Sequence, residues 1–67
     1  MNYQFTIIVP VYNEEDNVHP LVKQISEALV NFDYEIIYVD DGSTDNTIKN
    51  LKTIDNHRLK IYFTKKP

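Results

Sequence analysis

The sequence of 67 residues contains no cysteine, no tryptophan and a single glycine, Gly42. The absence of cysteine excludes disulfide bonds and thiolate metal sites, and fits a reducing compartment. A single glycine excludes a glycine-rich phosphate loop of either the P-loop or the dinucleotide-binding kind. The formal net charge is -3 and no extended basic cluster occurs. These two features argue against a nucleic-acid partner, because such partners are bound through lysines and arginines on their phosphates.

Long apolar runs are also missing from the sequence. No uninterrupted apolar stretch approaches the roughly 20 residues that a helix needs to cross a bilayer. The opening residues 1–4 lack the basic lead of a secretory signal. We therefore predict that the chain is cytoplasmic and that the protein contacts a membrane only through other parts of a longer sequence.

Three short apolar segments alternate with two amphipathic ones, which predicts an α/β fold in the order β-α-β-α-β. Strands are expected over residues 5–12, 34–40 and 59–64, which are rich in β-branched and aromatic residues. The first of them is apolar almost throughout, so we expect both of its faces to be buried, as in a parallel sheet. Pro10 should lie at the end of its strand or on an unpaired side, because proline donates no ladder hydrogen bond.

Two helices should connect these strands. The first is expected over residues 17–31, capped by Asn17, with Pro20 in the first turn, where proline is tolerated. Its apolar positions recur at helical spacing and are Val18, Leu21, Val22, Ile25, Ala28, Leu29 and Phe32. The second helix should follow a cap at Ser43 or Thr44. Its expected buried side is Ile48, Leu51 and Ile54.

Right-handed crossovers between these parallel strands predict half of a doubly wound sheet with strand order 3-2-1. The strand at 5–12 would then lie at an edge, where a long apolar strand invites pairing with other chains. We therefore interpret residues 1–67 as one partial domain, the N-terminal portion of a longer catalytic domain. We expect weak stability or self-association of the isolated chain, and a monomer that unfolds cooperatively would contradict this.

Acidic residues directly follow two of the predicted strands. The segment 10–15 reads PVYNEE and the segment 39–47 reads VDDGSTDNT. The carboxyl ends of parallel strands meet at one edge of a sheet, so these loops define one ligand crevice. Ionised carboxylates only accept hydrogen bonds, which suits the N–H edge of a base or the hydroxyls of a ribose. A bare diphosphate would be repelled, so we predict a nucleoside here and a diphosphate held elsewhere by a divalent cation with further carboxylates.

Together, in this order and at this spacing, the two segments resemble the beginning of the family 2 glycosyltransferases, which have the Rossmann-like GT-A fold. The forms PVYNEE and VDDGSTDNT look most like the polyprenyl- or dolichyl-phosphate sugar synthases, and the resemblance covers nearly all of the chain. It implies transfer of a sugar from a nucleoside diphosphate sugar to an acceptor such as polyprenyl phosphate. It also implies a role in glycan or cell-envelope biosynthesis.

The resemblance further implies a set of nucleotide-sugar-binding residues. Carried over by motif, this set is Pro10, Tyr12, Glu14, Val39, Asp40 and Asp41. Tyr12 would pack on or beside the base, and Asp41 would accept a hydrogen bond from the ring N–H of the base. Asp40 would have a structural or ribose-binding role, and Gly42 would supply the backbone freedom of the turn.

The same resemblance places two other parts of the family's machinery beyond this segment. The metal-binding Asp-x-Asp motif of the family lies further along, and so does the base on the acceptor side. We therefore assign no catalytic residue and no metal ligand here, and expect Mg²⁺ or Mn²⁺ in the full-length enzyme. The isolated segment should be inactive as a transferase.

Less specific interpretations stay open. The acids would also fit helix starts, where the helix dipole stabilises a negative charge by about 0.3–1 kcal/mol, and Tyr12 would fit a half-buried strand position. A receiver-like α/β regulatory module also gathers aspartates at parallel strand ends, but it needs a phosphoacceptor and a later lysine that have no evident place here. A truncated remnant without function is the third interpretation. His19 and His57 are predicted to be surface residues.

Overall fold

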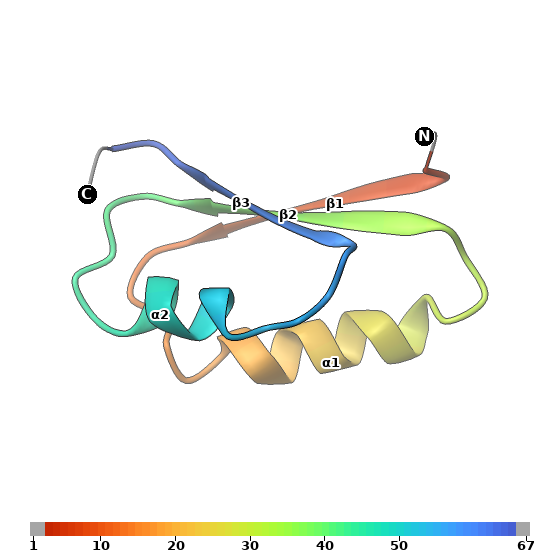
Figure 1. Cartoon of the computed structure of the whole chain (residues 1–67), viewed down its shortest axis with the longest axis horizontal. Helices are drawn as coiled ribbons and strands as arrows, with labels where there is room; N and C mark the ends of the chain where they lie inside the picture. Colours follow the sequence, from red (N-terminus) through yellow and green to blue (C-terminus); the bar gives the residue numbers. More distant parts are fainter. Residues whose placement is uncertain (1–2, 66–67) are drawn as a thin grey trace.

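The computed structural model describes residues 3–65, in which strands and helices alternate along the chain. The elements are β1 (Phe5–Val11), α1 (Val18–Ala28), β2 (Tyr34–Asp40), α2 (Thr47–Lys52) and β3 (Leu59–Phe63) (Figure 1). The strands form one parallel sheet in the order β1-β2-β3, with β2 at the centre. This confirms the α/β class and the strand order 3-2-1, read from the opposite edge.

The register of the sheet brings the ends of its strands together. Val11 pairs with Asp40, and Asp40 pairs with Phe63. Beyond these pairs, the amide of Asp41 donates to the carbonyl of Val11 at 3.0 Å, and the amide of Thr64 donates to the carbonyl of Asp40 at 3.0 Å. The loops that follow all three strands therefore start from the same edge of the sheet.

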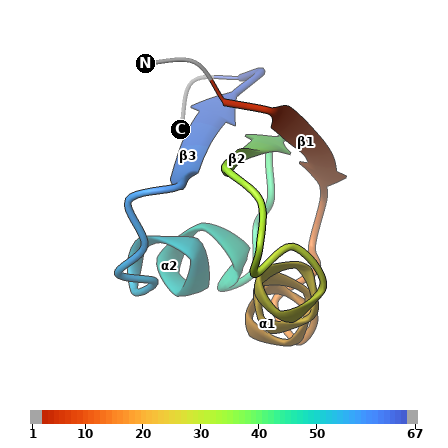
Figure 2. The ribbon, with the colours of Figure 1, turned by 90° about the vertical axis from the view of Figure 1, so that its right-hand side faces the viewer.

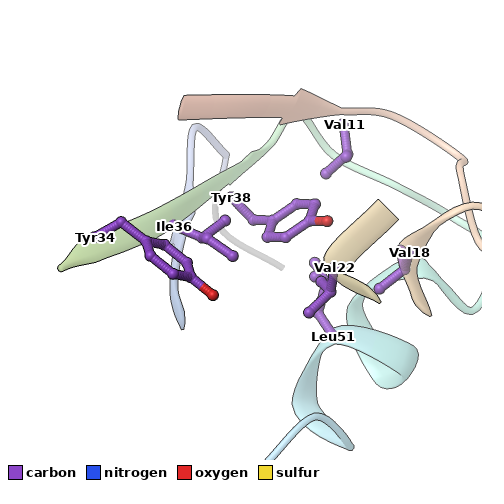
Figure 3. Packing of buried hydrophobic residues seen from close by; sticks show 7 residues of the cluster. All are labelled: Val11, Val18, Val22, Tyr34, Ile36, Tyr38 and Leu51. Carbon is purple, nitrogen blue, oxygen red and sulfur yellow. The ribbon is translucent and has the colours of Figure 1, made fainter. Parts of the chain in front are cut away.

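Both helices cover the same face of the sheet, as the end-on view shows (Figure 2). The side chains of β2 alternate between buried and half-buried positions from Tyr34 to Asp40, as expected for a strand with one covered face. The buried core lies between the sheet and the helices and consists of Val11, Val18, Val22, Tyr34, Ile36, Tyr38 and Leu51 (Figure 3). Leu51 brings α2 into this core, and Val18 and Val22 bring in α1.

The other face of the sheet is open among the described residues, so the expected burial of both faces of β1 is wrong for this part of the chain. Ile8 is 65% exposed and Tyr62 is 54% exposed. Two right-handed crossovers that step the same way across a sheet put both helices on one face. Pro10 is the next-to-last residue of the edge strand β1, as predicted from its missing N–H group.

The helix boundaries differ from the sequence expectations. Helix α1 ends at Ala28 instead of residue 31. Asn17 does precede α1, but its side chain makes no capping hydrogen bond. Its amide nitrogen Nδ2 instead donates to Oε2 of Glu14 at 2.7 Å, so Asn17 stabilises the preceding loop.

The start of α2 also corrects the sequence interpretation. The helix begins at Thr47 with Asn46 at the N-cap position, so the predicted cap at Ser43 or Thr44 is wrong. The hydrogen-bonding groups of Ser43 and Thr44 contact other loop residues, as described below. Leu51 is 1% exposed as predicted, whereas Ile48 and Ile54 are only half-buried.

We assign the expected self-association of the isolated chain to the open face of the sheet. Ile8→Thr keeps a β-branched side chain but replaces apolar surface by a hydroxyl. A symmetric dimer contains this site once on each copy, so the substitution should reduce the free energy of dimerisation by about 2 kcal/mol in total. This raises the dimer dissociation constant about 30-fold. Analytical ultracentrifugation of the two chains over a concentration series measures this.

Val30→Thr is the control for this experiment, because Val30 is 73% exposed in the turn after α1, away from the open face. It should leave association unchanged. A wild-type chain that stays monomeric throughout the series would contradict the assignment.

Candidate functional site

Asp40, the last residue of β2, is buried and shapes the loop that follows it. The residue is 1% exposed. Its Oδ2 accepts hydrogen bonds from the amides of Gly42 and Ser43, both at 3.0 Å, and its Oδ1 accepts one from the Ser43 hydroxyl. Gly42 adopts φ +87°, a conformation that glycine takes without steric cost. Both carboxylate oxygens of Asp40 therefore accept hydrogen bonds from the loop that follows β2.

Asp41, the residue after Asp40, is accessible. Its side chain is 62% exposed and lies 3.9 Å from Nζ of Lys65, measured from Oδ1. The hydroxyl of Thr64 donates to the same oxygen at 2.7 Å. Surface ion pairs of this kind contribute only about 0–1 kcal/mol. A ligand N–H group therefore has a carboxylate here that it can reach without displacing a buried interaction.

Tyr12 and Glu14 lie in the loop after β1. Tyr12 is 55% exposed and is the first residue beyond Val11. Val11 pairs with Asp40 in the sheet. Tyr12 is the residue after Val11 and Asp41 is the residue after Asp40, so both lie next to this pair. The structure thus brings an exposed aromatic ring and an exposed carboxylate to adjacent strand ends.

A pocket of about 110 Å³ lies between β1 and α1 and takes in two of the predicted site residues. Pro10 and Glu14 line it, together with Val9, Val11, Asn17, Val18, Leu21 and Tyr38. The Tyr38 hydroxyl is buried without a hydrogen-bond partner among the described residues. Burial raises the pKa of this hydroxyl, so it stays neutral.

The predicted site residues are therefore distributed over four environments. Pro10 and Glu14 line the pocket, whereas Tyr12 and Asp41 are exposed at the strand ends. Asp40 is buried. Val39 is half-buried on the open face of the sheet, where it pairs with Pro10 and Tyr62.

Sequence reasoning missed a group of residues that joins the two loops, and the first of them is Asn13. Its amide donates to the Ser43 hydroxyl oxygen at 3.0 Å. Its side-chain oxygen Oδ1 accepts from the amide of Thr44 at 2.8 Å and from the amide of Asp45 at 3.3 Å. We call Asn13, Ser43, Thr44 and Asp45 the Asn13 clasp.

A second set of contacts joins the same loops at the start of α2. The amide of Glu14 donates to Oγ1 of Thr47 at 2.8 Å, and the amide of Glu15 donates to Oδ2 of Asp45 at 3.4 Å. Desolvation acts to raise the pKa of Asp45, but the hydrogen bonds from Thr47 and Glu15 outweigh it and hold this pKa below its usual value. Asp45 is therefore ionised near neutral pH and keeps its role as an acceptor.

The available signal for these contacts was the composition of the second loop. Serine, threonine, aspartate and asparagine in succession favour hydrogen bonds between side chains and nearby backbone. Composition alone gives no partner some 30 residues away, as Asn13 is for Ser43.

The described residues offer no metal centre of their own. Among residues 3–65, no group of three or more histidine, cysteine, aspartate or glutamate side chains is arranged to hold a metal ion. His19 and His57 are both exposed, as predicted. In the same part of the chain, no helix has the length and apolar character needed to cross a membrane.

The fold and the site define a Rossmann-like α/β unit with its polar loops at the carboxyl edge of a parallel sheet. The sequence model described as glycosyl transferase family 2 matches residues 6–67. The chain belongs to this family, which confirms the resemblance drawn from its two motifs.

Individual relatives agree with this membership. The chain is 43% identical over 51 residues to a dodecaprenyl-phosphate galacturonate synthase of Rhizobium johnstonii, covering 73% of the chain and 15% of that relative. It is 45% identical over 67 residues to an uncharacterized glycosyltransferase of Synechocystis, covering 91% and 20%. It is 37% identical over 62 residues to an undecaprenyl-phosphate 4-deoxy-4-formamido-L-arabinose transferase of Proteus mirabilis, covering 84% and 19%. The chain thus spans a fifth or less of the length of these relatives.

Proposed function

We propose that this chain is the nucleotide-sugar-binding portion of a glycosyltransferase that moves a sugar from a nucleoside diphosphate sugar to a polyprenyl phosphate. The observation that carries the proposal is the exposure of Tyr12 and Asp41 at adjacent strand ends. Membership of the family supports the reaction class. The names of two relatives, which specify dodecaprenyl and undecaprenyl phosphate, support the class of acceptor.

The two exposed side chains suit different parts of a nucleoside. The ring of Tyr12 offers an aromatic face on which a base stacks, an interaction worth about 1–3 kcal/mol per base. The carboxylate of Asp41 accepts a hydrogen bond from a ring N–H of the base, and a hydrogen bond to a charged group contributes about 1.5–3 kcal/mol. Uracil and guanine both carry such an N–H, so these two groups recognise a nucleoside without choosing between them.

The diphosphate needs positive charge that these loops do not supply. The described acidic residues do not form a metal centre, so a divalent cation in the complete enzyme would be held by carboxylates from other parts of the protein. When bound, such a cation stabilises the negative charge of the departing nucleoside diphosphate. The residues of this chain bind and orient the nucleoside end.

A polyprenyl phosphate is a membrane lipid, so we propose that the complete protein works at the cytoplasmic face of a membrane. Family membership favours the transferase over a receiver-like regulatory module. A remnant without function is distinguished from a nucleotide-binding portion by the titration described next.

Titration of the isotopically labelled chain with uridine or guanosine diphosphate, followed by NMR, tests the proposal. We expect shift changes at Tyr12, Asp41 and Gly42. Asp41→Asn keeps the shape of the side chain but removes its charge, and should weaken binding about 10-fold or more. Without a bound cation the affinity will be low, so the titration extends to millimolar nucleotide.

Asp55→Asn is the matched control, because Asp55 is an exposed acid in the connection between α2 and β3. It removes the same charge away from the carboxyl edge and should leave binding unchanged. A folded wild-type chain that shows no shift with either nucleotide would refute the proposal and favour the remnant.

A further inference from the structure

Asn13 joins the two loops at the carboxyl edge of the sheet at a point next to Tyr12, and the contacts of Glu14 and Glu15 join them further along. We propose that Asn13 is a positioning residue, which fixes the distance and orientation between Tyr12 and Asp41 in the nucleoside site. This inference rests on the proposed function and deepens it. It assigns a role to a residue that makes no direct contact with the nucleoside.

The backbone of Asn13 has a conformation that few residues adopt. Asn13 adopts φ 51°, in the left-handed region, and is the only residue other than glycine to do so among residues 3–65. Asparagine visits this region more readily than most residues because its short polar side chain can bond locally. The conformation turns the chain sharply just after Tyr12, at the point where β1 has ended.

The side chain of Asn13 binds the backbone of the other loop. Its Oδ1 accepts from two successive amides of the other loop, those of Thr44 and Asp45, at 2.8 and 3.3 Å. Its own amide donates to the Ser43 hydroxyl oxygen. These bonds satisfy backbone amides of a loop that belongs to neither a helix nor a strand, and such amides otherwise depend on water.

The clasp is tied to the buried part of the molecule. The Ser43 hydroxyl that accepts from Asn13 itself donates to Asp40, which is 1% exposed. The network therefore runs from the end of β2 through Ser43 to the loop after β1. A network anchored on a buried carboxylate is more rigid than contacts between exposed side chains alone.

The members of the clasp flank the two proposed ligand contacts. Asn13 directly follows Tyr12, and Ser43 lies two residues after Asp41. Tyr12 and Asp41 are both largely exposed, so packing does not fix them. The bond from the Asp41 amide to the Val11 carbonyl holds the two strand ends together, and the clasp fixes the loops that continue from them. A preorganised site binds more tightly because less motion is lost on binding.

Three substitutions at Asn13 separate the possible causes of an effect. Asn13→Gly permits the positive φ but removes the amide. Asn13→Ala removes the amide and disfavours the φ. Asn13→Asp keeps an acceptor oxygen and tolerates the φ. Uncharged uridine and guanosine are the ligands, so that the added charge of aspartate does not repel a phosphate.

We expect Asn13→Ala and Asn13→Gly to weaken nucleoside binding about 10-fold, as expected when two or three ordered hydrogen bonds that preorganise a site are lost. Asn13→Asp should restore binding to within about threefold of the wild-type chain, because the acceptor is regained. Hydrogen exchange of the Thr44 and Asp45 amides is the second readout. These amides should be protected in the wild-type and Asn13→Asp chains and exchange rapidly in the other two.

Binding by Asn13→Gly that equals wild-type binding would overturn the inference, and so would an Asn13→Asp chain that binds as weakly as Asn13→Gly. Backbone shifts of Ile36 and Tyr38, both 0% exposed, show for every variant that the core is folded. The wild-type chain could protect its Thr44 and Asp45 amides and still bind no nucleoside. This result would refute both the proposed function and the positioning role. Nucleoside binding by a wild-type chain whose Thr44 and Asp45 amides are unprotected would refute the positioning role alone.

Discussion

Asp40→Ala is expected to leave a large fraction of the molecules unfolded. The carboxylate of Asp40 accepts hydrogen bonds from the Gly42 amide, the Ser43 amide and the Ser43 hydroxyl, and the residue is 1% exposed. Alanine leaves all three donors without this acceptor, at a cost of about 3–5 kcal/mol, as for other broken buried charge networks. A domain of this length has a total stability of about 3–10 kcal/mol. The loss is therefore comparable with the whole free energy of unfolding.

Urea unfolding followed by circular dichroism measures this effect, and the neighbouring residue supplies its control. Asp41→Ala makes the same chemical change one residue further on, where the side chain is 62% exposed, and should alter stability by less than about 1 kcal/mol. Asp41→Ala should instead weaken nucleotide binding. Equal unfolding midpoints for the two variants would show that the turn after β2 does not depend on the Asp40 carboxylate.

The contrast between these adjacent aspartates was partly readable from the sequence. Side chains alternate along a strand, and Tyr34, Ile36 and Tyr38 are the apolar residues of one face. Continuing this alternation puts Asp40 on the buried face and Asp41 beyond it, as observed. The motif resemblance treated both acids as site residues because a motif records residue types and not the direction of side chains.

The strands were more predictable than the helices. Strand β2 has the predicted bounds of 34–40, because a short β-branched and aromatic run ends there in acids. Helix α1 ends three residues before the predicted residue 31. The apolar spacing continues to Phe32, but the ring of Phe32 packs edge-on against Phe5 at 5.3 Å between centroids. A tertiary contact thus explains an apolar residue that the periodicity had assigned to the helix.

The connections between loops were the least predictable part of the site. That the two acidic loops meet follows from parallel strands, and this expectation is met by the pairing of Val11 with Asp40. The role of Ser43 and Thr44 was misread as helix capping, since these residue types are common caps. Their true partner, Asn13, becomes visible only when the fold has placed it beside them.

Leu51→Ala is expected to destabilise the chain by about 2–5 kcal/mol, the usual cost of removing a buried leucine side chain. Helix α2 has only six residues, and isolated helices shorter than about 12–15 residues are marginal in water. Its buried residues are Thr47 and Leu51, and Leu51 is its member of the core (Figure 3). Leu51 therefore supplies the buried apolar packing of α2.

Urea unfolding gives the size of the effect, and hydrogen exchange shows how far it spreads. Because Leu51 belongs to the same buried cluster as Val22 and Tyr38, we expect the amides of β2 to lose protection together with those of α2. Val30→Ala is the control, since it shortens an apolar side chain that is 73% exposed and should cost less than about 0.5 kcal/mol. If the amide of Ile36 kept its wild-type protection in Leu51→Ala, α2 would be a separately unfolding unit. The loop that carries Asp41 would then be ordered by the Asn13 clasp and Asp40, independently of the helix that follows it.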